Sequence, residues 1–337
     1  MTSKESSTHR ELLSLTPLRY TDHLIALGIA AVYVVWLCLT SRSVGIPRDE
    51  SIYFYAADRL SQWFTTLSDS GLAAFSEDSI KAGFSFNHEH PMLMKSLFGL
   101  SHHYLHAKWS LISDPILAYR LPTILFAGGL VYLTTLLGTA IGGLFVGGVS
   151  ALLVMGMPRL FFHAHLSCFD LPVSTMWLSI SLAYLGALHR RRWVVGAGVI
   201  LGLGLATKLN TFFAPFTLLG LSLYHLLQQK SGAETRVWWM RRYLWIGVSM
   251  TILGLLVFWA HWPWLYHHTW PRLLEYIHFH ARHVHYPVDY LGHLYYGPPF
   301  PIHFPFVFTL FTLPVAMLFL GAIGTVYVLI LSWWRWR

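Results

Sequence analysis

Residues 86–95 read Phe-Asn-His-Glu-His-Pro-Met-Leu-Met-Lys, which places an amide, two imidazoles, a carboxylate and an amine close together. Only 11% of the chain is charged, and ionisable side chains are rarely buried unless they are paired. Carboxylates and imidazoles move protons, and amines bind anions. We therefore expect this segment to face water or a binding site, with Glu89, His90 and Lys95 as candidate substrate-binding residues.

The composition predicts an all-α fold, a polytopic membrane protein of about eight transmembrane helices. The 337 residues are 55% hydrophobic, with a mean hydropathy of +0.51. The apolar runs are continuous rather than alternating, which is typical of helices and not of strands. The predicted spans are residues 22–42, 118–138, 141–157, 169–188, 193–209, 211–228, 243–262 and 305–331.

Basic residues between the spans predict the orientation. They group as Lys4, Arg10 and Arg19; Arg190, Arg191 and Arg192; Lys230, Arg236, Arg241 and Arg242; and Arg335 and Arg337. With eight alternating spans all four groups share one face, which the positive-inside rule makes cytoplasmic. We expect a multi-pass protein of a bacterial cytoplasmic (inner) membrane, with both termini cytoplasmic and the first span retained as an anchor. The net charge of +8 is then an orientation signal, and no nucleic-acid partner is expected.

Within this single transmembrane domain, residues 1–337, two long loops fall on the extracytoplasmic face: 43–117 and the histidine-rich 263–304. Apolar residues of 50–67 recur at helical spacing, which predicts an interfacial helix. A second interfacial helix is predicted to begin at Pro91. Its expected buried stripe is Leu93, Leu97, Leu100 and Tyr104.

Further ionisable residues flank the predicted outer ends of the spans. Arg159, His163, His165 and Asp170 surround the start of the fourth span, Lys208 lies at the end of the fifth, and Arg272 and Arg282 lie in the last outer loop. Ionisable residues at such places are costly and are functional candidates by default. We expect Lys208 and an outer-loop arginine to bind a phosphate, with simple snorkelling of Lys208 as the alternative.

Acids, bases and cations at a bilayer surface suit group transfer from a lipid-phosphate donor. The lipid chain lies between spans, cations hold the phosphate leaving group, and a carboxylate takes the proton from the incoming hydroxyl. Sugar transfer meets these requirements, because charge develops on the anomeric carbon and on the departing phosphate.

An ordered series of short motifs across roughly residues 20–310 resembles the integral-membrane GT-C glycosyltransferases. The motifs are Arg48-Asp49-Glu50, Asn87 to Lys95, Tyr119-Arg120-Leu121-Pro122, Asp170 and Ala206-Thr207-Lys208. The branch they resemble most comprises the protein O-mannosyltransferases and the bacterial aminoarabinose lipid A transferases.

The resemblance implies roles for individual residues. Asp49 is similar to the family's catalytic base, and Asp170 to its second acidic residue. His90-Pro91-Met92 resembles a His-Pro-Pro stretch with Met92 in place of the second proline. The resemblance further implies that Thr207 and Lys208 recognise the donor phosphate, that the donor is a polyprenyl-phosphate sugar, and that transfer inverts the anomeric carbon.

Each assignment has a structural alternative. Asp49 could cap the interfacial helix, and Glu50 is better placed as a first-turn dipole partner than as a second base. Asp170 could merely pair with a neighbouring cation. A divalent cation is an open option, with Glu89, His90, His163 and His165 as candidate ligands. Cys38 and Cys168 lie in separate spans, so neither a disulfide nor a thiol metal site is predicted.

Two other functions remain alternatives at this point. The chain has about eight spans where members of the family generally have more, so it could be a non-catalytic scaffold subunit packed against a partner membrane protein. A histidine-rich metal or proton transporter is the third interpretation. It is the least favoured, because ionisable residues are nearly absent from the span interiors.

Overall fold

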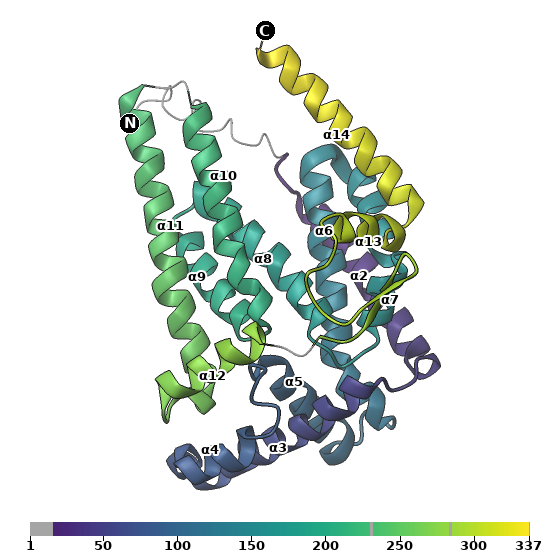
Figure 1. Ribbon diagram of the computed structural model, residues 1–337, viewed down its shortest axis with the longest axis vertical. Coiled ribbons are helices and arrows are strands. Elements are labelled where there is room, and N and C mark those ends of the chain that lie inside the picture. Colours follow the sequence, from purple (N-terminus) through teal and green to yellow (C-terminus); the bar gives the residue numbers. More distant parts are fainter. Residues whose placement is uncertain (1–15, 230–231, 283–284, 337) are drawn as a thin grey trace.

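The computed structural model describes residues 16–229, 232–282 and 285–336, and its regular structure is almost entirely helical (Figure 1). The α-helices are α2 (Tyr20–Thr40), α3 (Arg48–Ser70), α4 (Glu77–Phe84), α5 (Leu93–Ser101), α6 (Pro115–Met155), α7 (Pro158–Ala164), α8 (Asp170–His189), α9 (Arg192–Leu205), α10 (Ala214–Gln228), α11 (Ala233–Ala260), α12 (Thr269–Ala281), α13 (Phe304–Thr312) and α14 (Val315–Trp336). Short 3₁₀ or π-helical segments are η1 (Ser41–Ser43), η2 (Gly71–Phe75), η3 (His102–Lys108), η4 (Leu209–Phe213) and η5 (Pro263–Leu265). Strands β1 (Val288–Tyr290) and β2 (His293–Tyr295) form one antiparallel pair.

The all-helical class is confirmed, and the apolar helices agree with a membrane-embedded protein. Four helices are long and apolar enough to cross a bilayer: α2 extended through Ser43, α6, α8 and α11. The α13–α14 pair passes the same test only as a unit bent by 118°, so four or five elements of the described chain pass it by length and composition. Helices α9 and α10 have 14 and 15 residues, fewer than the roughly 20 that cross the hydrocarbon core. Eight crossings therefore stay a prediction.

Helix α6 contains the break expected between the second and third predicted spans. Gly142 and Gly143 have non-helical dihedrals, and Gly143 has a φ of 84° that favours glycine. A Cβ on Gly138 would lie 2.8 Å from the Cα of Gly147, whereas a straight helix separates residues nine apart by about 13 Å. The chain therefore reverses at the glycine pair, and the two parts of α6 pack against each other.

The helices form two groups joined at one end of the molecule. Helix α2 packs along α6, while α8, α9, α10 and α11 pack together around a second core. Helices α3, α4 and α5 lie across the end of both groups, next to α12, and α14 extends away near the opposite end (Figure 1). The first outer loop thus covers the end at which α8 begins.

Helices are present in both segments for which interfacial helices are predicted, with altered bounds. Helix α3 includes the predicted 50–67 and begins at Arg48, and α5 begins at Leu93 rather than Pro91. The predicted buried stripe of α5 was wrong, because the buried side chains include Met94, Lys95 and Phe98. The physical reason is Gly99, where an added Cβ would lie 2.2 Å from the carbonyl oxygen of Ala57 on α3. The backbones of α3 and α5 approach there, which turns this face of α5 inward.

Candidate functional site

The polar segment before α5 is held in place by Lys95. The buried Lys95 Nζ donates to the carbonyl oxygens of Asn87 at 2.5 Å and His90 at 2.8 Å. Asn87 has a φ of 55°, and its Nδ2 donates to Glu89 Oε1 at 2.9 Å. Burial lowers the pKa of Lys95 to about 7, against the opposing effect of the Glu89 charge. The amine expected to bind substrate therefore positions the loop that carries Glu89 and His90.

Helix α3 presents Asp49 and Tyr53 on one face, because they are four residues apart. The Tyr53 ring lies 4.4 Å from that of Phe169 and 6.0 Å from that of His90, centroid to centroid. Burial raises the pKa of Tyr53, and the negative charges of Asp49, Asp170 and Glu89 raise it further. Carboxylates from three separate segments therefore converge on Tyr53.

The Asp49 carboxylate is exposed, and among the described residues it has neither a hydrogen bond nor an ion pair. Helix α3 begins at Arg48 with Pro47 as its N-cap, so Asp49 is not the capping residue. It lies in the first turn of α3. A water-accessible carboxylate without a partner is able to accept a proton.

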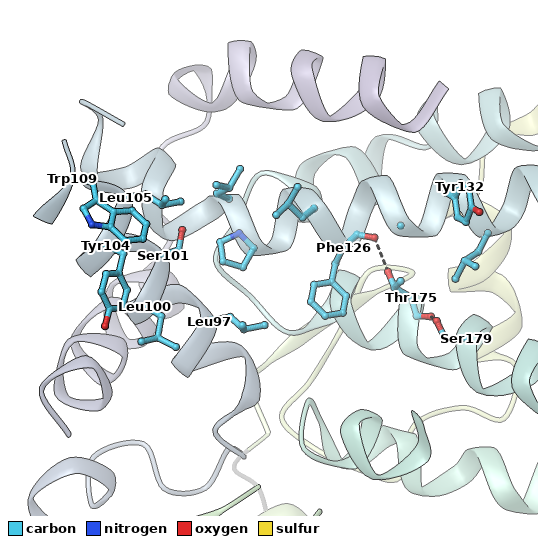
Figure 2. Close-up of a pocket in the computed structure, with 15 residues that line it drawn as sticks. Leu97, Leu100, Ser101, Tyr104, Leu105, Trp109, Phe126, Tyr132, Thr175 and Ser179 are labelled. Carbon is cyan, nitrogen blue, oxygen red and sulfur yellow. Dashed lines mark hydrogen bonds between the residues drawn. The ribbon is translucent and has the colours of Figure 1, made fainter. Parts of the chain in front are cut away.

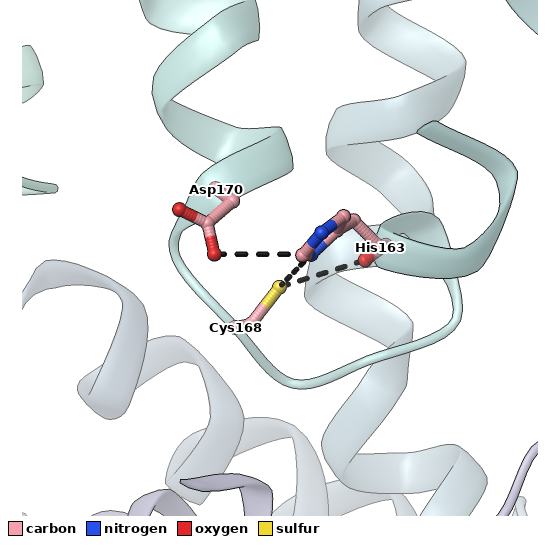
Figure 3. Close-up of side chains that lie close together, drawn as sticks. All are labelled: His163, Cys168 and Asp170. Carbon is pink, nitrogen blue, oxygen red and sulfur yellow. Dashed lines mark hydrogen bonds and ion pairs between the residues drawn. The ribbon is translucent and has the colours of Figure 1, made fainter. Parts of the chain in front are cut away.

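Asp170 and Lys208 form an ion pair at the start of α8. Lys208 Nζ lies 2.6 Å from Asp170 Oδ1, and the two side chains are 24% and 50% exposed. His163 Nδ1 lies 3.8 Å from Asp170 Oδ2 (Figure 3). The partner that a lysine at this place requires is thus Asp170, 38 positions away in the chain. Because both groups remain accessible, an anionic ligand can compete with Asp170 for the ammonium group.

His163, Cys168 and Asp170 offer one nitrogen, one sulfur and one oxygen within 4.8 Å of one another (Figure 3). Burial raises the pKa of the Cys168 thiol to about 12, so the thiol is protonated at neutral pH, whereas a metal requires the thiolate. The ammonium of Lys208 already neutralises Asp170. A divalent cation bound by these three side chains would have to take the place of the thiol proton and of the Lys208 ammonium.

Glu50 lies next to Asp49 in sequence and is only 2% exposed. Its carboxylate receives two hydrogen bonds from Arg120 on α6, Nε to Oε1 at 2.8 Å and Nη2 to Oε2 at 2.7 Å. Glu50 Oε1 also accepts from the backbone N–H of Ser167 at 2.8 Å. Glu50 thus joins α3, α6 and the segment before α8, and so fixes the start of the helix that carries Asp49.

Three other candidates lie away from Asp49, Glu89 and Asp170, the carboxylates around Tyr53. His165 is buried, with Nε2 2.8 Å from Thr40 Oγ1 and Nδ1 2.7 Å from the carbonyl oxygen of Phe161. Arg272 is 9% exposed; its guanidinium stacks on the Trp264 ring at 3.8 Å and donates to the Trp264 carbonyl oxygen. Arg282 is exposed at the end of α12. Among these candidate cations, Lys208 is therefore the one that contacts a carboxylate of this group, that of Asp170.

Helix α12 covers the site from the last outer loop. Glu275 Oε1 accepts from His88 Nε2 at 3.1 Å. The rings of Phe279 and His280 lie 6.4 and 6.0 Å from that of His90. The β1–β2 pair packs instead toward α13, where Tyr290 contacts Phe304. Of the predicted loop 263–304, the α12 part is what reaches the site.

Two apolar grooves border the site. One, of about 710 Å³, runs between α5, η3, α6 and α8 and has no charged lining residue (Figure 2). Its lining residues Leu97 and Phe126 pack against the same buried cluster as Tyr53, a cluster that includes Phe169. The other, of about 340 Å³, is lined by Leu205 and Phe212, which flank Lys208 in sequence. Both are suited to hydrocarbon chains.

Tyr53 was not predicted as a site residue, and neither was the proximity of Cys168 to His163 and Asp170. Tyr53 carries a local signal, since it lies one helical turn after Asp49. The Cys168 contact carries none, because it depends on the turn between α7 and α8. Comparison of the chain with protein-family models, with curated proteins and with solved structures gave no match.

Proposed function

We propose that the protein is a glycosyltransferase that moves a sugar from a polyprenyl-phosphate donor to an acceptor hydroxyl. The observation that carries the proposal is the exposed Asp49 carboxylate, which acts on Tyr53 together with Asp170, combined with the accessible Asp170–Lys208 pair and two apolar grooves. A base, an anion-binding cation and space for a lipid chain are the three parts that this reaction requires.

The proposed reaction is a single displacement. The acceptor oxygen attacks the anomeric carbon, the bond from that carbon to the phosphate oxygen breaks, and Asp49 takes the hydroxyl proton. The bond electrons leave with the polyprenyl phosphate, whose added charge Lys208 stabilises after exchanging Asp170 for the phosphate. Attack opposite the leaving group inverts the anomeric carbon, and Glu89 and His90 border the space for the sugar.

The site is assigned to the extracytoplasmic side of a bacterial cytoplasmic (inner) membrane. Arg191, Arg241 and Arg242 gather at the opposite end of α8 from Asp170, and clustered basic residues favour the cytoplasmic side. The donor lipid and the surrounding bilayer lipids are then the expected partners. The activity is proposed to be mannosyltransferase-like, and this part of the proposal depends on the motif resemblance alone.

Mass spectrometry of the gently solubilised protein tests the proposal. Wild type is expected to carry a polyprenyl phosphate or its sugar derivative. Lys208→Gln is expected to lose this lipid, and Asp49→Asn to keep it. Lys81→Gln, at an exposed lysine of α4, is the matched control. Equal lipid in wild type and Lys208→Gln would contradict the role of Lys208, and absence of such lipid from wild type would contradict the donor class.

One observation favours the non-catalytic scaffold subunit as a second candidate. Helix α13 has no buried residue, and Phe311 and Val315 at its bend with α14 are 81% and 80% exposed. A last span that packs so little on its own chain offers a surface to a partner membrane subunit. A fixed companion protein in the same spectra, without bound lipid phosphate, would favour this function.

A further inference from the structure

A basic pocket lies at the end of the molecule away from Asp49. It has a volume of about 740 Å³ and is lined by His189 at the end of α8, Arg191 and Val194 at the start of α9, and Arg241 and Arg242 on α11. Helix α8 has 20 residues, so about 30 Å separates this pocket from Asp170. The pocket is therefore distinct from the proposed transferase site.

The residues of α11 that line the pocket lie on one face of that helix. Trp238, Arg241, Arg242 and Trp245 occupy relative positions 0, 3, 4 and 7, which bring them onto one side of the helix. Two guanidinium groups are thus bracketed by two indoles along the helix axis. The arrangement combines positive charge with apolar surface on the same face.

The floor of the pocket is rigid because α9 and α11 are in close contact. A Cβ on Gly198 would lie 2.6 Å from the Ser249 carbonyl oxygen, and one on Gly202 would lie 2.6 Å from that of Gly254. Ser249 Oγ donates to the Val194 carbonyl oxygen at 2.7 Å. The arginines therefore extend from two helices whose separation is fixed.

The positive charge of the pocket is not neutralised within the described chain. No carboxylate lines the pocket, and none of the described ion pairs includes Arg191, Arg241 or Arg242. Arg242 Nε donates to the Ala187 carbonyl oxygen at 2.6 Å, which orients its guanidinium without adding a counter-charge. Such a cluster is suited to an anionic ligand.

The position and the indoles indicate which anion. The pocket lies at the end of α8 and the start of α9, against the first half of α11. Trp238 and Trp245 are 38% and 64% exposed, as tryptophans at a membrane interface are. Val194 and Val195 continue the apolar wall along α9. We propose that this pocket binds the headgroup of an anionic phospholipid, with its phosphate on Arg191 and Arg241 and its acyl chains along Trp245 and Val195.

Native mass spectrometry with added defined lipids tests this proposal. Delipidated protein in detergent is titrated with phosphatidylglycerol and, separately, with phosphatidylcholine. Arg191→Gln with Arg241→Gln is expected to weaken phosphatidylglycerol binding about 30-fold, from the contribution of each arginine to anionic-lipid attraction. Phosphatidylcholine binding should be unchanged. Circular dichroism and gel filtration establish that each variant is folded.

The control is Arg192→Gln with Arg236→Gln, two exposed arginines that do not line the pocket. It removes the same charge and should retain most of the phosphatidylglycerol binding. An equal loss in both double variants, or none in the first, would overturn the proposal. Displacement of the lipid by millimolar inorganic phosphate, with saturation, would identify a soluble phosphate site instead and would also overturn it. Because these readouts do not involve transfer, they are independent of the proposed function.

Discussion

The buried pair of Glu50 and Arg120 allows a quantitative prediction. All five N–H groups of Arg120 are used: two reach Glu50, and three reach the carbonyl oxygens of Ser41, Val44 and Gly45 at 2.7 to 3.0 Å. The two side chains are 0% and 1% exposed. Arg120→Met would leave the Glu50 charge buried with only the Ser167 amide as donor. Breaking a buried pair in this way costs about 3–5 kcal/mol, a large part of a typical unfolding free energy of about 5–15 kcal/mol.

The matched control is the Arg42–Asp114 ion pair, another arginine–carboxylate pair, in which the arginine is exposed and the Asp114 side chain is 13% exposed. Arg42 Nε lies 2.8 Å from Asp114 Oδ2, but the Arg42 side chain is 78% exposed. Arg42→Met is expected to cost about 0–1 kcal/mol, because water screens the pair. The assay is the free energy of unfolding in mixed micelles, followed by circular dichroism during titration with SDS.

The Glu50→Gln/Arg120→Met double variant completes the cycle. Since each single change leaves a buried charge or polar group unpaired, the double variant should be less destabilised than the sum of the two, by roughly 1–3 kcal/mol. If Arg120→Met is no more destabilising than Arg42→Met, the pair does not hold α3 against α6. The positioning of Asp49 through Glu50 would then have to be abandoned.

Three further predictions concern Asp49, Lys95 and Gly99. Asp49→Asn should lower the proposed sugar transfer by about 10²–10⁴-fold. The unfolding free energy should stay within about 0.5 kcal/mol of wild type, because the carboxylate is exposed. Retained transfer would refute the role of Asp49 as base. Lys95 has a folded pKa of about 7, lowered from 10.5, so between these values the unfolded state binds more protons. The unfolding free energy should rise with pH there, by about 1 kcal/mol per unit; a wild-type pH profile in Lys95→Met would disprove the assignment. Gly99→Ala should cost about 1–3 kcal/mol because its Cβ would meet the Ala57 carbonyl oxygen. In contrast, Gly28→Ala in α2, with open space around it, should be neutral or stabilising; equal effects in thermal unfolding would argue against the α3–α5 contact.

Local pattern was sufficient where the signal lies within one helix. The apolar runs predicted the helical class because only internally hydrogen-bonded segments are stable in lipid. The spacing in 50–67 predicted α3, and the Gly142-Gly143 break falls next to the expected end of a span. The role of Asp49 as base follows from the motif resemblance and stays a prediction, while its place in the first turn of α3 agrees with the helix predicted there.

Tertiary structure decided which polar groups face the site and which make their contacts within the protein. Lys95 and Arg272 look like anion-binding residues in the sequence, yet one holds a loop and the other stacks on Trp264. Helix α5 is a second example. Its sequence allows either the face with Leu93 and Leu97 or the face with Met94 and Phe98 to be buried, and the close approach of Gly99 to α3 determines that the second face is buried. The partners of Glu50 and Lys208 lie 70 and 38 positions away. A hydrogen bond at such a separation depends on how whole helices pack, and helical periodicity carries no information about that packing.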